Sequence, residues 1–156
     1  MPLHFQGLDT ATAEALRAGT PDAYGHAAEH YAQSDGSGVP CRHCLRDVPA
    51  GQGVLVLAWR PFATAHPYAE TGPIFLCEDT CASGAGPEVP ANLTTSPDYL
   101  VKAYSADERI IYGTGAITPR DEVAVRADAL LANPAVAFVD VRSARNNCFA
   151  VRITRG

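Results

Sequence analysis

Positive charge is scarce in this sequence. Only one lysine, Lys102, accompanies eleven arginines among 156 residues, and the formal net charge is -5. Binding to nucleic acid needs a clustered excess of basic side chains that neutralise phosphates. We therefore expect no nucleic-acid partner, and we expect any site for an anion to be built from arginine.

Long apolar runs are also missing. No basic start followed by an apolar stretch occurs in residues 1–19, and no segment reaches the roughly 18 apolar residues of a membrane helix. We expect a cytoplasmic protein that does not contact a membrane. Thiols stay reduced in that compartment, so the clustered cysteines are better read as metal ligands or redox centres than as structural disulfides.

The common short signatures of catalysis are absent as well. Gly113-Thr114-Gly115 lacks the third glycine of a dinucleotide-binding loop, and no Gly-x-Ser-x-Gly sequence is present. The sequence therefore identifies no catalytic residue and no reaction.

The length and composition are those of a folded globular protein. A chain of 156 residues with 47% hydrophobic and 19% charged residues is about one domain's worth, so we expect residues 1–156 to form a single domain. Asp9 and Gly19 predict a capped helix over residues 10–18. Residues 20–40 are rich in glycine and proline, which predicts a loop with at most one or two helical turns at 26–33.

Two strands are predicted around the cysteines. The continuous apolar run at residues 54–59 indicates a strand that is central in its sheet and covered on both faces. Residues 72–77 form a second short strand that ends at Cys77. Residues 82–97 are low in apolar residues and predict a surface loop.

The last part of the chain, residues 98–156, has a ββαββ-like pattern. Strands are predicted at 99–104 and 109–115, and again at 137–143 and 148–154, each pair forming a hairpin. Thr118 and Pro119 predict the start of the intervening helix, and Asn133-Pro134 predicts its end near residue 132. The fold class expected is α+β: an antiparallel or mixed sheet with one or two helices packed on it, and a zinc-knot-like loop region at 41–81.

Two cysteine pairs carry the clearest chemical signal. Cys41 and Cys44 are separated by two residues, and Cys77 and Cys81 by three. Two such pairs from distant segments can supply the four thiolates of a tetrahedral, structural zinc site. Three alternatives stay open: a redox pair at Cys41 and Cys44, simple buried thiols or a local disulfide, and a site in which His43 replaces one sulfur.

A set of polar residues predicts a second site, a pocket for a small anionic ligand or peptide. Arginine guanidinium groups and amides near a hairpin end are suited to binding carboxylate or phosphate. The alternative is that Asp140 and Arg142, two apart on one strand, simply pair with each other. The predicted ligand-binding residues are Tyr68, Glu70, Arg109, Tyr112, Arg142, Arg145 and Asn146.

Four blocks of the sequence resemble the bacterial proteins grouped as domain of unknown function 1203. The blocks are residues 40–46, 67–75, 109–115 and 141–149, so the resemblance extends over most of the chain. It implies a small soluble bacterial protein. It implies no activity and no catalytic residues.

The leading functional hypothesis is a zinc-stabilised binding module with an arginine-lined pocket. The alternatives are an enzyme of hydrolase or transferase type that uses the same tyrosine, glutamate, arginine and asparagine side chains, or a thiol redox or sensor protein. Either predicted hairpin could leave an open sheet edge, which is compatible with a dimer.

Overall fold

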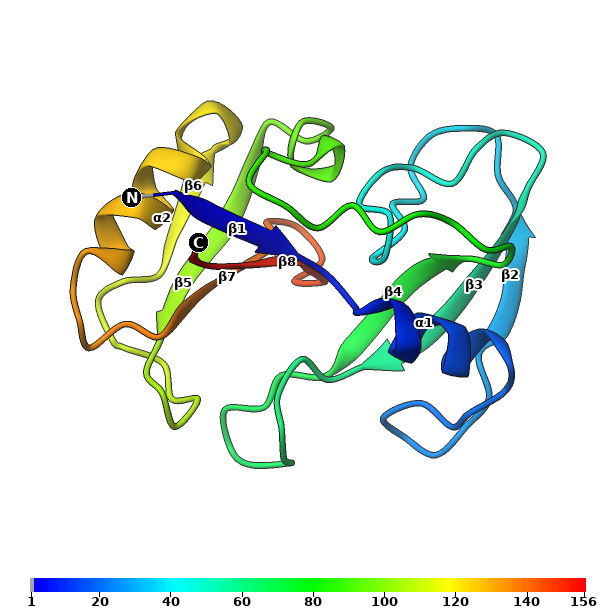
Figure 1. The fold of residues 1–156 in the computed structure, drawn as a ribbon, viewed down its shortest axis with the longest axis horizontal. Coiled ribbons are helices and arrows are strands. Elements are labelled where there is room, and N and C mark those ends of the chain that lie inside the picture. Colours follow the sequence, from blue (N-terminus) through cyan, green and yellow to red (C-terminus); the bar gives the residue numbers. More distant parts are fainter. Residues whose placement is uncertain (1) are drawn as a thin grey trace.

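The computed structural model describes residues 2–156 and contains two antiparallel sheets and two α-helices. The five-stranded sheet has the order β1-β8-β7-β5-β6, and the three-stranded sheet has the order β2-β3-β4. The two sheets lie toward opposite ends of the long axis of the molecule (Figure 1). The predicted α+β class is confirmed, and every strand pairing is antiparallel.

The five-stranded sheet is built mainly from the last third of the chain. Its strands are β1 (Leu3–Gln6), β8 (Phe149–Arg155), β7 (Phe138–Ser143), β5 (Asp98–Tyr104) and β6 (Ala116–Pro119). Helix α2 (Val123–Leu131) packs its buried side chains against this sheet and forms one hydrophobic core with it. The first strand lies beside the last, so both ends of the chain meet at one sheet edge.

The three-stranded sheet holds the cysteine region. It consists of β2 (Glu29–Gln33), β3 (Gly53–Trp59) and β4 (Gly72–Cys77). Helix α1 (Thr10–Arg17) lies at this end of the molecule (Figure 1), and its Leu16 joins a second core formed with the apolar residues of β3 and β4. A short 3-10 turn (Ala91–Leu93) lies in the long connection back to β5.

Several predicted elements occur as expected. Asp9 accepts a hydrogen bond from the Thr12 amide at the start of α1, and Gly19 after its end has a φ of 102°. The middle position of β3 is confirmed, although Val56 and Ala58 are only half-buried, so one face of this strand is less covered than its apolar sequence predicts. The last hairpin is confirmed too, with Asn147 in a left-handed conformation.

Three predictions of local structure are wrong. The segment predicted to be loop or helical turn at 26–33 contains strand β2, which pairs with β3. Residues 109–115 form no strand: only Ile110 bridges to Tyr104, and the strand that pairs with β5 is β6. Thr118 does not cap a helix: it pairs with Tyr99 inside the sheet, and α2 begins only at Val123, after the 3-10 turn Arg120–Glu122. The short strands β2 and β6 form because the distant strands β3 and β5 offer hydrogen bonds to them, which local propensity cannot anticipate.

Candidate metal centre

The two cysteine pairs meet at one point. The Sγ atoms of Cys41, Cys44, Cys77 and Cys81 all lie within 4.8 Å of one another. The Sγ atom of Cys41 is 3.9 Å from that of Cys81, and the Sγ atom of Cys44 is 3.9 Å from that of Cys77. Four sulfurs placed tetrahedrally about 2.3 Å from a zinc ion are separated by about 3.8 Å, so the cluster has the dimensions of a four-thiolate site.

The first pair lies in a tight turn that is fixed by its backbone. The Cys41 amide donates to the carbonyl of Arg46, and Leu45 adopts a positive φ of 61°. Arg42, almost fully buried, donates from Nε to the carbonyl of Phe149 and from Nη1 to that of Pro40. Burial lowers the pKa of Arg42 to about 10, which still leaves the guanidinium charged at neutral pH. The turn is therefore anchored to strand β8 of the other sheet.

The second pair arrives from β4 and the loop after it. Cys77 is the last residue of β4, and its amide points to the sulfur of Cys41 at 3.3 Å. The chain then turns at once and brings Cys81 back to the cluster. Gly84 allows this loop to lie against the first turn, because a Cβ atom at that position would be 2.1 Å from the carbonyl oxygen of Cys44. Neither cysteine pair is followed directly by a glycine, and the close approach of Gly84 was missed at the sequence level.

The four sulfurs differ in their surroundings. Cys41, Cys44 and Cys77 are buried, whereas Cys81 is partly exposed. Hydrogen bonds from Cys44 and Cys77 lower the pKa of Cys41, and burial, together with the neighbouring Cys41 charge, raises the pKa of Cys81 to about 11. Four thiolates in one buried place would repel each other, so all four cysteines could be ionised together only around a cation.

His43 is not a member of the sulfur cluster. Its ring is buried, Nδ1 lies 3.1 Å from the sulfur of Cys81, and Nε2 lies 2.8 Å from the hydroxyl of Thr10. Burial is the main cause that lowers the pKa of His43, so the ring is neutral. If the Cys81 sulfur is a thiolate, it can only accept, so Nδ1 would carry the single proton of the neutral ring and Nε2 would accept from Thr10. His43 thus contacts a cysteine rather than replacing one.

The predicted ligand-binding residues are distributed over separate places. Glu70 and Arg142 form an ion pair with 3.3 Å between Oε2 and Nε. Arg145 instead pairs with Asp98 at 2.8 Å and is largely exposed. Asn146 lines a cavity of about 480 Å³, and no other predicted ligand-binding residue lines that cavity. Within residues 2–156, no hydrogen bond or ion pair joins Arg145 or Asn146 to Glu70.

Three further residues of that set lie together at the surface. The hydroxyl groups of Tyr68 and Tyr112 are 2.9 Å apart, and the guanidinium of Arg109 lies over the Tyr68 ring at 5.3 Å from its centre. Tyr112 is strongly exposed. Of these three residues, only Tyr68 is close in sequence to the Glu70 and Arg142 pair, two residues before Glu70.

Glu70 is the centre of a network that the sequence did not predict in full. Lys102 donates to both carboxylate oxygens at 2.9 and 2.8 Å, and the Tyr104 hydroxyl donates to Oε1. Burial opposes ionisation of Glu70, but these hydrogen bonds outweigh it and hold its pKa below the usual value. Arg142 does not pair with Asp140, whose carboxylate is bound by Arg152 at 2.7 and 2.9 Å. The alternative pairing considered from the sequence is therefore wrong.

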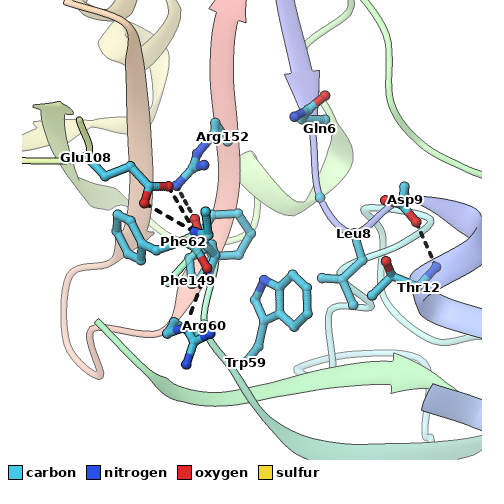
Figure 2. A pocket seen from close by; sticks show the side chains of 13 residues that line it. Gln6, Leu8, Asp9, Thr12, Trp59, Arg60, Phe62, Glu108, Phe149 and Arg152 are labelled. Carbon is cyan, nitrogen blue, oxygen red and sulfur yellow. Dashed lines mark hydrogen bonds between the residues drawn. The ribbon is translucent and has the colours of Figure 1, made fainter. Parts of the chain in front are cut away.

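A cavity of about 370 Å³ lies between the start of α1 and the end of β3 (Figure 2). Figure 2 shows Trp59 between Arg60 and Leu8 in this cavity. None of the predicted ligand-binding residues lines it. Its carboxylates already accept backbone amides: Asp9 from Thr12, and Glu108 from Ala63.

The fold and the sulfur cluster together define an α+β protein with a four-cysteine centre that could hold a metal ion. The chain belongs to the family described as protein of unknown function (DUF1203), whose model matches residues 38–155. The resemblance seen in the sequence is thereby confirmed. No curated protein and no solved structure matches the chain. Among the described residues, no helix has the length and apolar character needed to cross a membrane.

Proposed function

We propose that the protein is a small binding module whose fold is fastened by one structural Zn²⁺ held by Cys41, Cys44, Cys77 and Cys81. The observation that carries this proposal is the approach of four sulfurs from two distant segments to within 4.8 Å of one another. Soft thiolate ligands in this number select zinc, or iron in iron–sulfur proteins, over hard cations. Four protein ligands leave no position for water, so the metal supports the fold instead of activating a reactant.

Metal analysis of the purified protein tests the proposal. We expect one zinc per chain by mass spectrometry of the metals, and an anomalous scattering peak at the zinc edge between the four sulfurs. Loss of the peak in a variant that lacks Cys77 would support the assignment. Protein that binds less than about a tenth of an equivalent of zinc when loaded with excess metal would contradict it, and so would iron at full occupancy.

A thiol redox function is the weaker alternative. A redox pair of this spacing normally lies at the start of a helix, whose amides lower the thiol pKa. The segment after Cys44 forms turns and begins no helix. Two sulfur contacts of 3.9 Å, Cys41 to Cys81 and Cys44 to Cys77, also join the first cysteine pair to the second. If redox chemistry were the function, the Cys41–Cys44 disulfide should dominate after mild oxidation; we expect zinc to block its formation.

For the binding function we propose a small anionic ligand or peptide, and the support comes from Arg142. This side chain is only 2% exposed, and its Nη2 atom has no hydrogen-bond partner among the described residues. The single carboxylate of Glu70 is shared between two cations, Arg142 and Lys102. Buried donors without partners and surplus positive charge favour an anion nearby. The group formed by Tyr68, Arg109 and the exposed Tyr112 would form the outer side of this site.

Titration with inorganic phosphate and with citrate, followed by amide chemical shifts, tests the ligand proposal. We expect shifts around Arg109 and Tyr68 at millimolar ligand, and at least a several-fold weaker response in Arg109→Gln. Arg120→Gln is the control, because Arg120 is exposed and lies beside Asp121, 3.9 Å away. Equal binding by both variants, or no shifts with either anion, would count against the site. We place the protein in the cytoplasm, where reducing conditions would keep the thiols available to the metal.

A further inference from the structure

Helix α1 makes direct contact with the sulfur cluster through Arg17. The Nη2 atom of Arg17 donates to the sulfur of Cys81 at 3.1 Å, and Nε donates to the carbonyl of Cys77 at 2.8 Å. One guanidinium therefore holds both members of the second cysteine pair. The remaining nitrogen, Nη1, is buried without a partner among the described residues.

The other end of α1 reaches the same cysteine. Thr10, the first residue of the helix, bonds to His43 Nε2, whose Nδ1 lies 3.1 Å from the Cys81 sulfur. Two separate contacts thus run from α1 to Cys81, one direct and one through the ring of His43. Cys81 is also the one member of the four that is not fully buried. The helix lies over the exposed corner of the site.

A bound metal ion would make these contacts more stabilising. Zn²⁺ with four thiolates carries a net charge of -2, and removing that charge from water is costly unless hydrogen-bond donors or cations surround the sulfurs. Arg17 supplies a positive charge, and the Nδ1 atom of His43 lies where an N–H group would donate to the Cys81 thiolate. Groups that contact metal ligands in this way typically change metal affinity by about 10- to 100-fold when they are replaced.

We propose, building on the zinc site proposed above, that Arg17 and His43 hold Cys81 in place on the metal and couple metal binding to the docking of α1. Metal binding then orders the helix, and loss of the helix contacts opens the Cys81 corner. Residues 1–37 lie outside the segment matched by the family, residues 38–155. The N-terminal segment therefore adds the positioning residue Arg17 to a centre whose four sulfurs, like His43, lie in the matched segment.

Zinc release to a chelating dye measures the first half of the proposal. Arg17→Ala in the full chain should release zinc at least about 10-fold faster than the unchanged protein, and Arg17→Lys should fall between the two because it keeps the charge but loses the second donor. Arg126→Ala is a matched control. Arg126 also donates to a carbonyl, that of Thr114, and also has a buried nitrogen without a partner, but it lies on α2.

Hydrogen exchange of the α1 amides measures the second half. Chelation of zinc should accelerate exchange at residues 13–18 in the unchanged protein, whereas in Arg17→Ala exchange there should already be fast with zinc bound. Thr10→Val, an exposed position, provides a milder variant with the same direction of change. The coupling is refuted if zinc is bound but Arg17→Ala and Arg126→Ala release it equally fast. It is also refuted if the exchange rate of the α1 amides is the same with and without zinc. In both cases the zinc site itself remains supported. If the unchanged protein binds no zinc, both fall together.

Discussion

Replacing Cys44 by serine should destabilise the fold far more than replacing Cys148 by serine. The difference reports the stabilisation of the fold by the bound metal. Cys44 is buried in the core beside α1 and is one of the four clustered sulfurs. Cys148 is partly exposed, lies outside the cluster, and its sulfur donates a weak hydrogen bond to the carbonyl of Asn146 at 3.7 Å. Both changes remove one sulfur from the same chain, so the pair separates metal binding from the chemistry of the substitution.

The expected magnitude follows from linkage. At free zinc of about 100 times the dissociation constant, the metal stabilises the folded chain by about 2.7 kcal/mol. Loss of that term lowers Tm by about 5 to 10 °C for a chain of this size. A buried serine hydroxyl without a partner adds about 1 to 3 kcal/mol. Cys148→Ser should change stability by no more than about 0.5 kcal/mol, as is usual away from buried features.

Thermal unfolding with and without a chelator is the assay. The unchanged protein and Cys148→Ser should both lose several degrees of Tm when the chelator is added, whereas Cys44→Ser should be low from the start and insensitive to it. The reasoning is refuted if Cys44→Ser still binds a full equivalent of zinc, or if the chelator leaves the Tm of the unchanged protein where it was.

Two further predictions concern the packing around the site and the polar network. Gly84→Ala should cost about 1 to 3 kcal/mol and speed zinc release, because its Cβ would lie 2.1 Å from the Cys44 carbonyl, whereas Gly72→Ala has open space and should be neutral within about 0.5 kcal/mol by urea unfolding. Tyr104→Phe should raise the pKa of Glu70 in a carboxylate NMR titration. The pKa of Glu70 is lower in the folded protein, so the ionised carboxylate stabilises the fold at pH values above the ordinary glutamate pKa of about 4.3. This stabilisation is lost as the pH falls through the folded pKa. Tyr104→Phe should make it smaller. An unchanged Glu70 titration would contradict the importance of the hydroxyl.

The features that the sequence predicted correctly are local. The Asp9 cap, the glycine exit of the first helix and the left-handed turn at Asn147 each depend on a few adjacent residues, and each occurs. The spacing of the cysteines likewise predicted which sulfurs would gather, because two short pairs leave few other ways to assemble four ligands. The charged network was harder: Glu70 and Arg142 were both named from the sequence, but their direct pairing and the contacts of Lys102 and Tyr104 with Glu70 were not predicted.

Tertiary structure decided everything that depends on distant pairing. Strands β1 and β2 are four and five residues long, with sequences that carry no strong strand pattern, and they form because β8 and β3 offer hydrogen bonds to them. Residues 109–115 look like a strand, but only Ile110 bridges to Tyr104 at the end of β5, and β6 pairs with the rest of that edge. The contacts of Arg17 with Cys77 and Cys81 also depend on residues that are distant in sequence. Amino-acid order alone determined the four thiols of the candidate metal centre, but only the packing of α1 across 64 residues of sequence brought a guanidinium to the sulfur of Cys81.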